Sequence, residues 1–251
     1  MLSIAERELR SLFVSPLAWT VLAVVQILLA YMYLIQLESF MEWQPKLSSV
    51  PNAQGGITVW VVAPVFNAAG FMMMVIAPLL TMRLVSEELR SGTFTLLLSA
   101  PRSMTEIVLG KFLGLFLFLS LVVVLVLVMC LLLLLGGNLD FGLLASCVLG
   151  LLLLTAGIVS AGLFMSTLTQ QPVAAAASTF GLLFVLWIID YAGVGDEARS
   201  SALFTYLSIS NHVNAFFRGV FDSRDVIYYL LFVTTFLALA VKRLDGIRLQ
   251  R

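Results

Sequence analysis

Charged residues are scarce in this sequence, and histidine and cysteine are almost missing from it. Asp, Glu, Lys and Arg make up 11% of the 251 residues and the formal net charge is +0. A soluble chain would carry about a quarter charged residues. Zero net charge gives no support for a whole-protein field that attracts nucleic acid. The 61% hydrophobic fraction instead predicts an integral membrane protein.

The residue types that build catalytic and metal sites are also lacking. The single histidine, His212, has no cysteine or carboxylate partners at zinc-ligand spacing. Cys130 and Cys147 lie deep in apolar runs, where we interpret them as small residues at helix contacts rather than as a disulfide or a metal site. The only Gly-Lys pair, Gly110-Lys111, lacks the other residues of a phosphate-binding loop. We therefore expect no enzyme activity and no bound cofactor or metal in this chain itself.

Six apolar segments predict an all-α integral membrane protein with six transmembrane helices. Their starts carry helix signals: Ser15-Pro16 precedes the first, a capping box of Ser103 and Glu106 the third, and Pro172 opens the fifth. The predicted spans are residues 16–37, 59–82, 104–135, 141–167, 172–190 and 225–241. Acids and arginines in the first 13 residues argue against a cleavable signal peptide, so we expect the first span to remain a helix.

Residues 192–224 contain an amphipathic stretch that does not read as a continuous span. We predict short outer interfacial or re-entrant helices there, and a seventh span is the alternative. With six spans, most of the 14 lysines and arginines fall on the side that carries both termini. By the positive-inside rule, both termini and residues 83–103 are expected to face the cytoplasm.

A charged, amphipathic segment separates the second and third spans. It reads RLVSEELRSGTFTLLLSAP from Arg83 to Pro101 and carries four charges, on Arg83, Glu87, Glu88 and Arg90. Its first part is good helix-forming sequence, Gly92 is a helix stop, and Thr93 can cap the next turn. Spacing alone leaves two interpretations open. The segment could dock on a partner, or Glu87 could pair with Arg83 or Arg90 in a solvated cap.

These residues resemble the signature of ABC-2-type permeases, the membrane subunits of ATP-driven exporters. The resemblance covers essentially the whole chain, and its most specific part is the pattern E-E-x-x-x-G-T-x-x-x-L-L-x-x-x-P. It is carried by Arg83, Glu87-Glu88, Gly92-Thr93, Leu96-Leu97-Leu98, Pro101, the run Glu106 to Phe112, and Glu8-Leu9-Arg10-Ser11 with Ser15-Pro16. Near the end, Gly219 to Asp225 and Tyr228 resemble the branch of the gliding-motility permease GldF.

The resemblance implies a single transmembrane domain over residues 1–251 with three special parts. Residues 1–15 would form an interfacial helix, residues 83–103 a coupling helix that inserts into a groove on a cytoplasmic ATPase, and residues 192–224 outer helices that close the exit. The implied coupling residues are Arg83, Glu87, Glu88, Arg90, Gly92 and Thr93. In the interfacial helix, Glu6, Arg7, Glu8 and Arg10 would face water or the partner, and Ile4, Leu9, Leu12 and Phe13 would face lipid.

The resemblance also implies partners. A separate ABC ATPase subunit would bind ATP and Mg, and a second permease copy or a related permease would complete the substrate pathway, with membrane lipid around it and an extracytoplasmic accessory protein as a further candidate. Two other classes stay open: an ATP-independent channel or secondary transporter, and a non-transporting membrane scaffold. The few charges inside the spans disfavour a secondary transporter, because intramembrane charges usually mark ion pathways. The sequence does not specify a substrate.

Overall fold

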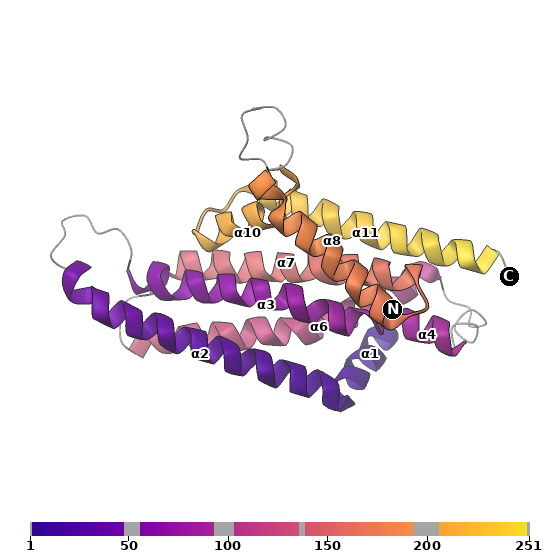
Figure 1. Cartoon of the computed structure of the whole chain (residues 1–251), viewed down its shortest axis with the longest axis horizontal. Coiled ribbons are helices and arrows are strands. Elements are labelled where there is room, and N and C mark those ends of the chain that lie inside the picture. The colour runs from indigo at the N-terminus through magenta and orange to yellow at the C-terminus, as the bar shows by residue number, and fades with distance from the viewer. Residues whose placement is uncertain (1, 48–55, 93–102, 136–138, 193–205, 250–251) are drawn as a thin grey trace.

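The computed structural model describes residues 2–47, 56–92, 103–135, 139–192 and 206–249, and these residues form helices without any strand (Figure 1). The helices are α1 (Leu2–Val14), α2 (Pro16–Leu47), α3 (Ala63–Thr81), α4 (Ser86–Ser91), α6 (Met104–Leu131), α7 (Phe141–Leu168), α8 (Pro172–Ala192), α10 (Ile209–Phe217) and α11 (Ser223–Leu249). A π-helical turn (Thr58–Val62) precedes α3, and a 3-10 turn (Leu132–Leu135) follows α6. Six helices in the described part are long and apolar enough to cross a membrane, which confirms the predicted number of spans.

Most predicted span boundaries agree with the structure, but two ends are wrong. The first span was expected to end at residue 37 and the last at 241, whereas α2 continues to Leu47 and α11 to Leu249. Charged residues ended the apolar runs in the prediction. Glu and Lys are nevertheless good helix formers, so Glu38 and Lys242 end the apolar stretch without ending the helix. Both helices therefore extend past their apolar parts.

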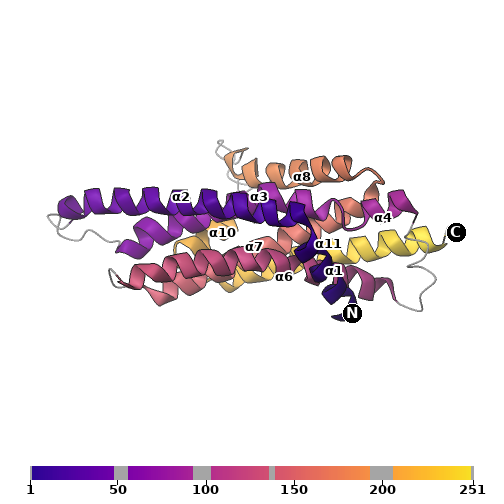
Figure 2. The same cartoon turned by 90° about the horizontal axis from the view of Figure 1, so that it is seen from below.

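The helix α7 is the centre of the bundle. The helices α3, α6, α8, α10 and α11 all pack against it (Figures 1 and 2). In the most apolar 18-residue stretch of each span, about 61% of α7 is buried inside the fold, against 22% of α2 and 17% of α8. Small residues such as Gly157, Ser160 and Ala161 let neighbouring helices approach α7 closely. The two loosely packed spans, α2 and α8, leave large apolar surfaces exposed.

The two ends of the bundle differ in what they carry. Both chain termini, α1 and α4 lie at one end, which we call the terminal end (Figure 1). The helix α10 packs on the N-terminal half of α7, toward the other end, where Ser146 donates a hydrogen bond of 2.9 Å to the Phe216 carbonyl. With nine residues, α10 is too short to span a membrane. Of the predicted outer region, residues 193–205 lie outside the described part.

Side-chain caps start two of the spans. The Ser103 hydroxyl accepts from the Glu106 N–H at 3.3 Å and starts α6. The Asp140 carboxylate accepts from the N–H groups of Gly142 and Leu143 at 2.8 and 3.2 Å and starts α7. These caps satisfy N–H groups that have no partner within the first turn of a helix. The cap predicted at Ser103 is therefore confirmed.

Candidate functional site

The short helix α4 contains three of the six predicted coupling residues, Glu87, Glu88 and Arg90, and its start is fixed to the centre of the bundle. The N–H groups of Val85 and Ser86 donate to the Ser166 hydroxyl of α7 at 3.1 and 3.0 Å. The same hydroxyl donates to the Met82 carbonyl at 3.2 Å. Ser86 is fully buried, and its own hydroxyl donates back to that carbonyl. One serine on α7 therefore holds the turn between α3 and α4, and its role was not predicted from the sequence.

The end of α4 is set by Gly92, as predicted. Gly92 adopts the left-handed conformation, with φ of 73° and ψ of −1°, in the C-cap position. A residue with a Cβ atom would be strained there, so glycine ends the helix after six residues. Thr93, the other residue of this predicted pair, lies outside the described residues. The helix is thus a short element fixed at its first residue and stopped at its last.

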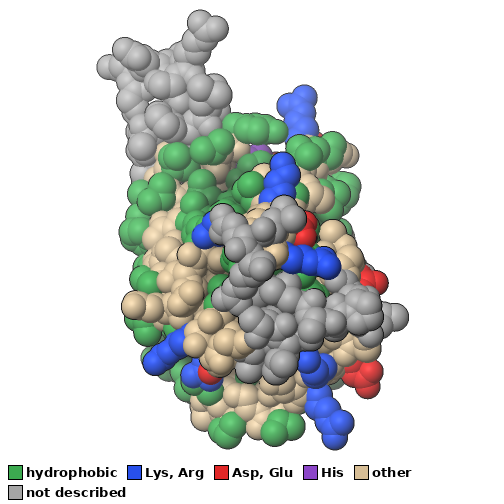
Figure 3. Space-filling model, turned by 90° about the vertical axis from the view of Figure 1, so that its right-hand side faces the viewer, with side chains coloured by type: hydrophobic (Ala, Val, Ile, Leu, Met, Phe, Trp, Pro, Cys, Tyr) green, Lys and Arg blue, Asp and Glu red, His purple; other side chains and the backbone are tan. Residues whose placement is uncertain are grey.

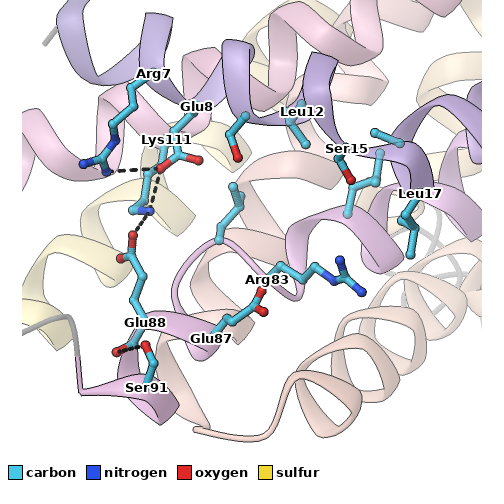
Figure 4. A pocket seen from close by; sticks show the side chains of 14 residues that line it. Arg7, Glu8, Leu12, Ser15, Leu17, Arg83, Glu87, Glu88, Ser91 and Lys111 are labelled. Atoms are coloured by element: carbon cyan, nitrogen blue, oxygen red, sulfur yellow. Dashed lines mark hydrogen bonds and ion pairs between the residues drawn. The ribbon is translucent and has the colours of Figure 1, made fainter.

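A buried lysine joins α4 to two other helices. Lys111, on α6, has only 2% of its side chain exposed, and its Nζ lies 2.7 Å from Glu88 Oε1 of α4 and 2.9 Å from Glu8 Oε1 of α1 (Figure 4). Burying an ammonium group without a partner is very costly, so the two carboxylates are what allow Lys111 to be buried and charged. We call Glu8, Glu88 and Lys111 the Lys111 cluster. It places Glu88 toward the interior of the fold.

The helix α1 packs against α6 at the position of Gly114. A Cβ atom at Gly114 would lie 2.7 Å from the Glu8 Cβ and 3.1 Å from the Ala5 carbonyl oxygen, so only glycine permits this approach. Ile4 and Ala5 are buried at the same contact. The resemblance implied that Ile4 would face lipid and Glu8 water. The structure instead buries Ile4 and directs Glu8 to Lys111, because the α6 backbone is accessible at Gly114.

The other charged residues of α1 are exposed. Glu6 and Arg10 are exposed, and Arg7 is exposed with its Nη2 atom 3.6 Å from Glu8 Oε1. These three side chains lie on the surface of the fold. The helix α1 is therefore polar on one side and docked to the bundle on the other.

A polar pocket of about 430 Å³ opens between α1, the start of α2, the end of α3, α4 and α6. The Lys111 cluster forms one side of it, and Arg83 and Glu87 lie across from that cluster (Figure 4). Both Arg83 and Glu87 are exposed. Within the described part of the chain neither residue forms an ion pair, so the alternative in which Glu87 pairs with Arg83 or Arg90 is not observed there. Arg83 and Glu87 are therefore the two exposed charged residues of the pocket lining without an ion-pair partner in the described part of the chain.

Arg90 points elsewhere. It is exposed and does not line the pocket. Side chains of both charges gather over the terminal end, as the space-filling view of that end shows (Figure 3). The exposed charges of α4 are therefore part of a mixed-charge surface rather than of an apolar membrane surface.

A second polar cluster lies between α10 and the start of α11. His212 Nδ1 is 2.6 Å from Asp225 Oδ1, and His212 Nε2 is 2.9 Å from the Tyr206 carbonyl oxygen. The Tyr228 ring stacks on the imidazole with a centroid distance of 4.0 Å. We call Tyr206, His212, Asp225 and Tyr228 the His212 cluster. No group of three or more His, Cys, Asp and Glu residues able to hold a metal ion is found among the residues that the structure describes.

Two side chains of the site had no assigned role in the sequence analysis. Lys111 was noted only as part of a motif, and Ser166 was not singled out. The sequence did carry a signal for Lys111, because it lies near the start of a strongly apolar run. A lysine buried in such a run requires a carboxylate partner. No comparable signal exists for Ser166, since serine is common at contacts between membrane helices.

Comparison with known protein families identifies the chain's family. The model of the family described as ABC-2 family transporter protein matches residues 2–241. The match includes α1, α4 and the Lys111 cluster, and it extends over nearly the whole chain. No curated protein matches the sequence.

Proposed function

The chain belongs to the ABC-2 family of transporter proteins, and from that premise we propose that it is the permease subunit of an ATP-driven exporter. It is a multi-pass membrane protein with six candidate spans. In this proposal the chain does not hydrolyse ATP. A separate cytoplasmic ABC ATPase subunit binds ATP and Mg and drives the change of the permease from inward-open to outward-open.

The observation that carries the proposal is the position of α4 at the terminal end. A loop that only reversed the chain would not need a helix whose start is bound by Ser166 and whose middle is bound by Lys111. The helix presents exposed charges of both signs, Glu87 and Arg90, beside a polar pocket of about 430 Å³. A rigid, charged element of this kind suits docking on a soluble partner through complementary charges. The proposed coupling residues are Arg83, Glu87, Glu88, Arg90, Gly92 and Thr93.

The proposal includes the assembly and its orientation. Two copies of this chain, or this chain and a related permease, would form the pathway between them, and the exposed apolar surfaces of α2 and α8 are available for that contact. Both termini and α4 would face the cytoplasm of a bacterial inner membrane, with α1 at the membrane surface through Glu6, Arg7 and Arg10. The likeness of residues 219–225 to the gliding-motility branch is a proposed subfamily. An extracytoplasmic accessory protein remains a proposed partner.

The test is a charge exchange on α4 with a matched control on α11. The variant Glu87→Arg/Arg90→Glu inverts an acid and a base that are three residues apart and exposed. The control Asp245→Arg/Arg248→Glu makes the same inversion, at the same spacing, on an exposed segment of α11 at the terminal end. Each protein is affinity-purified in mild detergent from its native host, and the proteins that accompany it are identified and quantified by mass spectrometry.

We expect a stoichiometric soluble protein with a phosphate-binding loop to accompany the unmodified chain and the α11 control. The α4 variant should lose that protein, because inverted charges would oppose those of the partner. Equal recovery of the ATPase with both variants would contradict docking through α4. Absence of any ATPase from the unmodified chain, even after cross-linking, would contradict the proposed function as a whole.

A further inference from the structure

The Lys111 cluster is the polar connection between α4 and α1. Its two acids come from helices that are far apart in the sequence, because Glu8 precedes Lys111 by 103 residues and Glu88 precedes it by 23. The helix α4 packs on α7 and α8, whereas α1 packs on α6 and α2. Lys111 therefore brings together two elements that otherwise belong to different sides of the terminal end.

The electrostatics of the cluster favour a tight connection. Lys111 has 2% of its side chain exposed, Glu8 15% and Glu88 20%. Water screens such a cluster weakly, so both contacts are stronger than surface ion pairs. The second oxygen of Glu88 is buried without a hydrogen-bond partner, which leaves Lys111 as the one strong partner of that carboxylate in the described structure. Separating α4 from Lys111 while Glu88 stays buried would leave that carboxylate without its cation, which is costly.

The connection continues from α1 into the membrane. A single residue, Ser15, separates α1 from α2, and its N–H lies 3.1 Å from both the Ser11 and the Leu12 carbonyl oxygens. The junction between α1 and α2 is therefore short and hydrogen-bonded, so a movement of α1 should also move the start of α2. Only 22% of the most apolar 18-residue stretch of α2 is buried, so α2 is one of the two spans with the least packing against the rest of the bundle.

We infer that Lys111 is a positioning residue that transmits movement of α4 to α1 and, through the Ser15 junction, to α2. This inference rests on the proposed docking of an ATPase at α4. In it, Glu88 and Glu8 are the two attachment points, Gly114 keeps α1 against α6, and α2 is the span that shifts. Docking without the cluster would hold the ATPase in place but leave α1 and α2 where they are.

The test measures the position of α1 by electron–electron double resonance in the full complex with the ATPase. Spin labels are placed at Ser3→Cys on α1 and Asp245→Cys on α11, in a chain carrying Cys130→Ala and Cys147→Ala. The variants are Glu8→Gln, Lys111→Met and Lys111→Arg, and the matched control is Glu106→Gln, which alters a partly exposed acid near the start of α6 without touching the cluster. Distances are compared between the nucleotide-free and the ATP-trapped complex.

We expect ATP to change the distance between the labels in the unmodified complex and in Glu106→Gln. Glu8→Gln and Lys111→Met should lose the change while the ATPase stays bound, and Lys111→Arg should restore it because arginine keeps the charge. A merely structural role would not predict loss of the ATP-dependent change in a complex that still assembles. An unaltered change in Glu8→Gln would overturn the inference.

A measurement on the chain alone separates this inference from the proposed function. Without any ATPase, Glu8→Gln should broaden the distance distribution between α1 and α11, and Glu106→Gln should not. If the ATPase never binds but the broadening occurs, the proposed function fails and the role of Lys111 in holding α1 stands. If the ATPase binds and neither variant broadens the distribution, the proposed function stands and the inference fails.

Discussion

The two short helices α1 and α10 are attached to the bundle in parallel ways at different places. Each packs against a glycine of a long helix, α1 at Gly114 of α6 and α10 at Gly150 of α7. Each is also tied by a buried pair of charged or ionisable residues, Glu8 with Lys111 in one case and His212 with Asp225 in the other. The same physical solution, close backbone approach plus one strong polar contact, therefore serves both helices.

The difference lies in what each contact connects. His212 and Asp225 are 13 residues apart, so the His212 cluster closes a local turn between α10 and α11, and aromatic rings cover it. The Lys111 cluster connects three elements that are distant in the sequence and lines an open pocket with further charges. One cluster is closed and local, and the other is open and long-range. We therefore expect the His212 cluster to stabilise the fold, and the Lys111 cluster to transmit movement of α4 to α1 as well.

Replacing Lys111 should have the largest effect. Lys111→Met keeps the volume but leaves Glu8 and Glu88 without their cation, and we expect it to lower the free energy of unfolding by about 3 kcal/mol, the lower end for breaking a buried pair because both acids retain some exposure. Cys130 and Cys147 are free and buried, so a thiol-reactive dye reports unfolding in detergent. The control is Lys242→Met, which removes an exposed lysine. A similar loss in both variants would contradict the special role of the buried lysine.

The glycine contacts should rank next, and they should differ from each other. A Cβ atom at Gly150 would lie 2.5 Å from the Cβ of Phe216, which is fully buried, so Gly150→Ala should cost about 2 kcal/mol through overpacking. Gly114→Ala should cost less, because the side chain that its Cβ would meet, Glu8, is partly exposed and can shift, whereas Phe216 is enclosed. The same dye assay measures both variants.

Gly246→Ala serves as the control for this pair, since a Cβ atom there meets nothing within 4 Å. Alanine has the higher helix propensity, so this change should leave stability equal or slightly raised. If Gly114→Ala proved more damaging than Gly150→Ala, then α1 rather than α10 would be the more rigidly held helix.

Weakening the His212 cluster should have a smaller effect than removing Lys111. Asp225→Asn keeps an oxygen near His212 Nδ1 but removes the carboxylate charge, and we expect a loss of about 1.5 kcal/mol, typical of a hydrogen bond to a charged group. Asp222→Asn is the control, because Asp222 is exposed and its carboxylate accepts a local hydrogen bond of 2.9 Å from the Arg224 N–H, which an asparagine oxygen can also accept. Binding of the ATPase should be unaffected in both. Loss of the ATPase in Asp225→Asn would contradict a purely local role for this cluster.

The spans and their starts could be predicted from the sequence because they depend on local properties. Apolar length located all six, and the cap at Ser103 marked where the third begins. The ends of α2 and α11 were missed because charge interrupts hydropathy without interrupting a helix. The charged segment at α4 and its stop at Gly92 were also local signals.

The Lys111 cluster could not be assembled from the sequence for a different reason. Its members are brought together by the packing of α1 on Gly114, a contact between residues about a hundred positions apart that no local pattern encodes. The side chain to which Glu88 points could not be predicted from the sequence either. Helical spacing placed it beside Glu87 on a charged segment, but only the fold shows that one acid faces Lys111 and the other lies across the pocket.

The smallest expected effect compares two cations that approach the same oxygen. Glu8 Oε1 lies 2.9 Å from Lys111 Nζ and 3.6 Å from Arg7 Nη2, but the Lys111 side chain is 2% exposed and that of Arg7 61%. Arg7→Gln should therefore lower the free energy of unfolding by less than about 0.5 kcal/mol, as exposed pairs do, and added salt should abolish the difference. The dye assay at low and high ionic strength measures it. A loss for Arg7→Gln comparable with that for Lys111→Met would mean that the cluster behaves as a surface network of charges. The contrast between the buried lysine and the exposed arginine would then fail. The argument that burial allows Lys111 to transmit movement of α4 to α1 would fail with it.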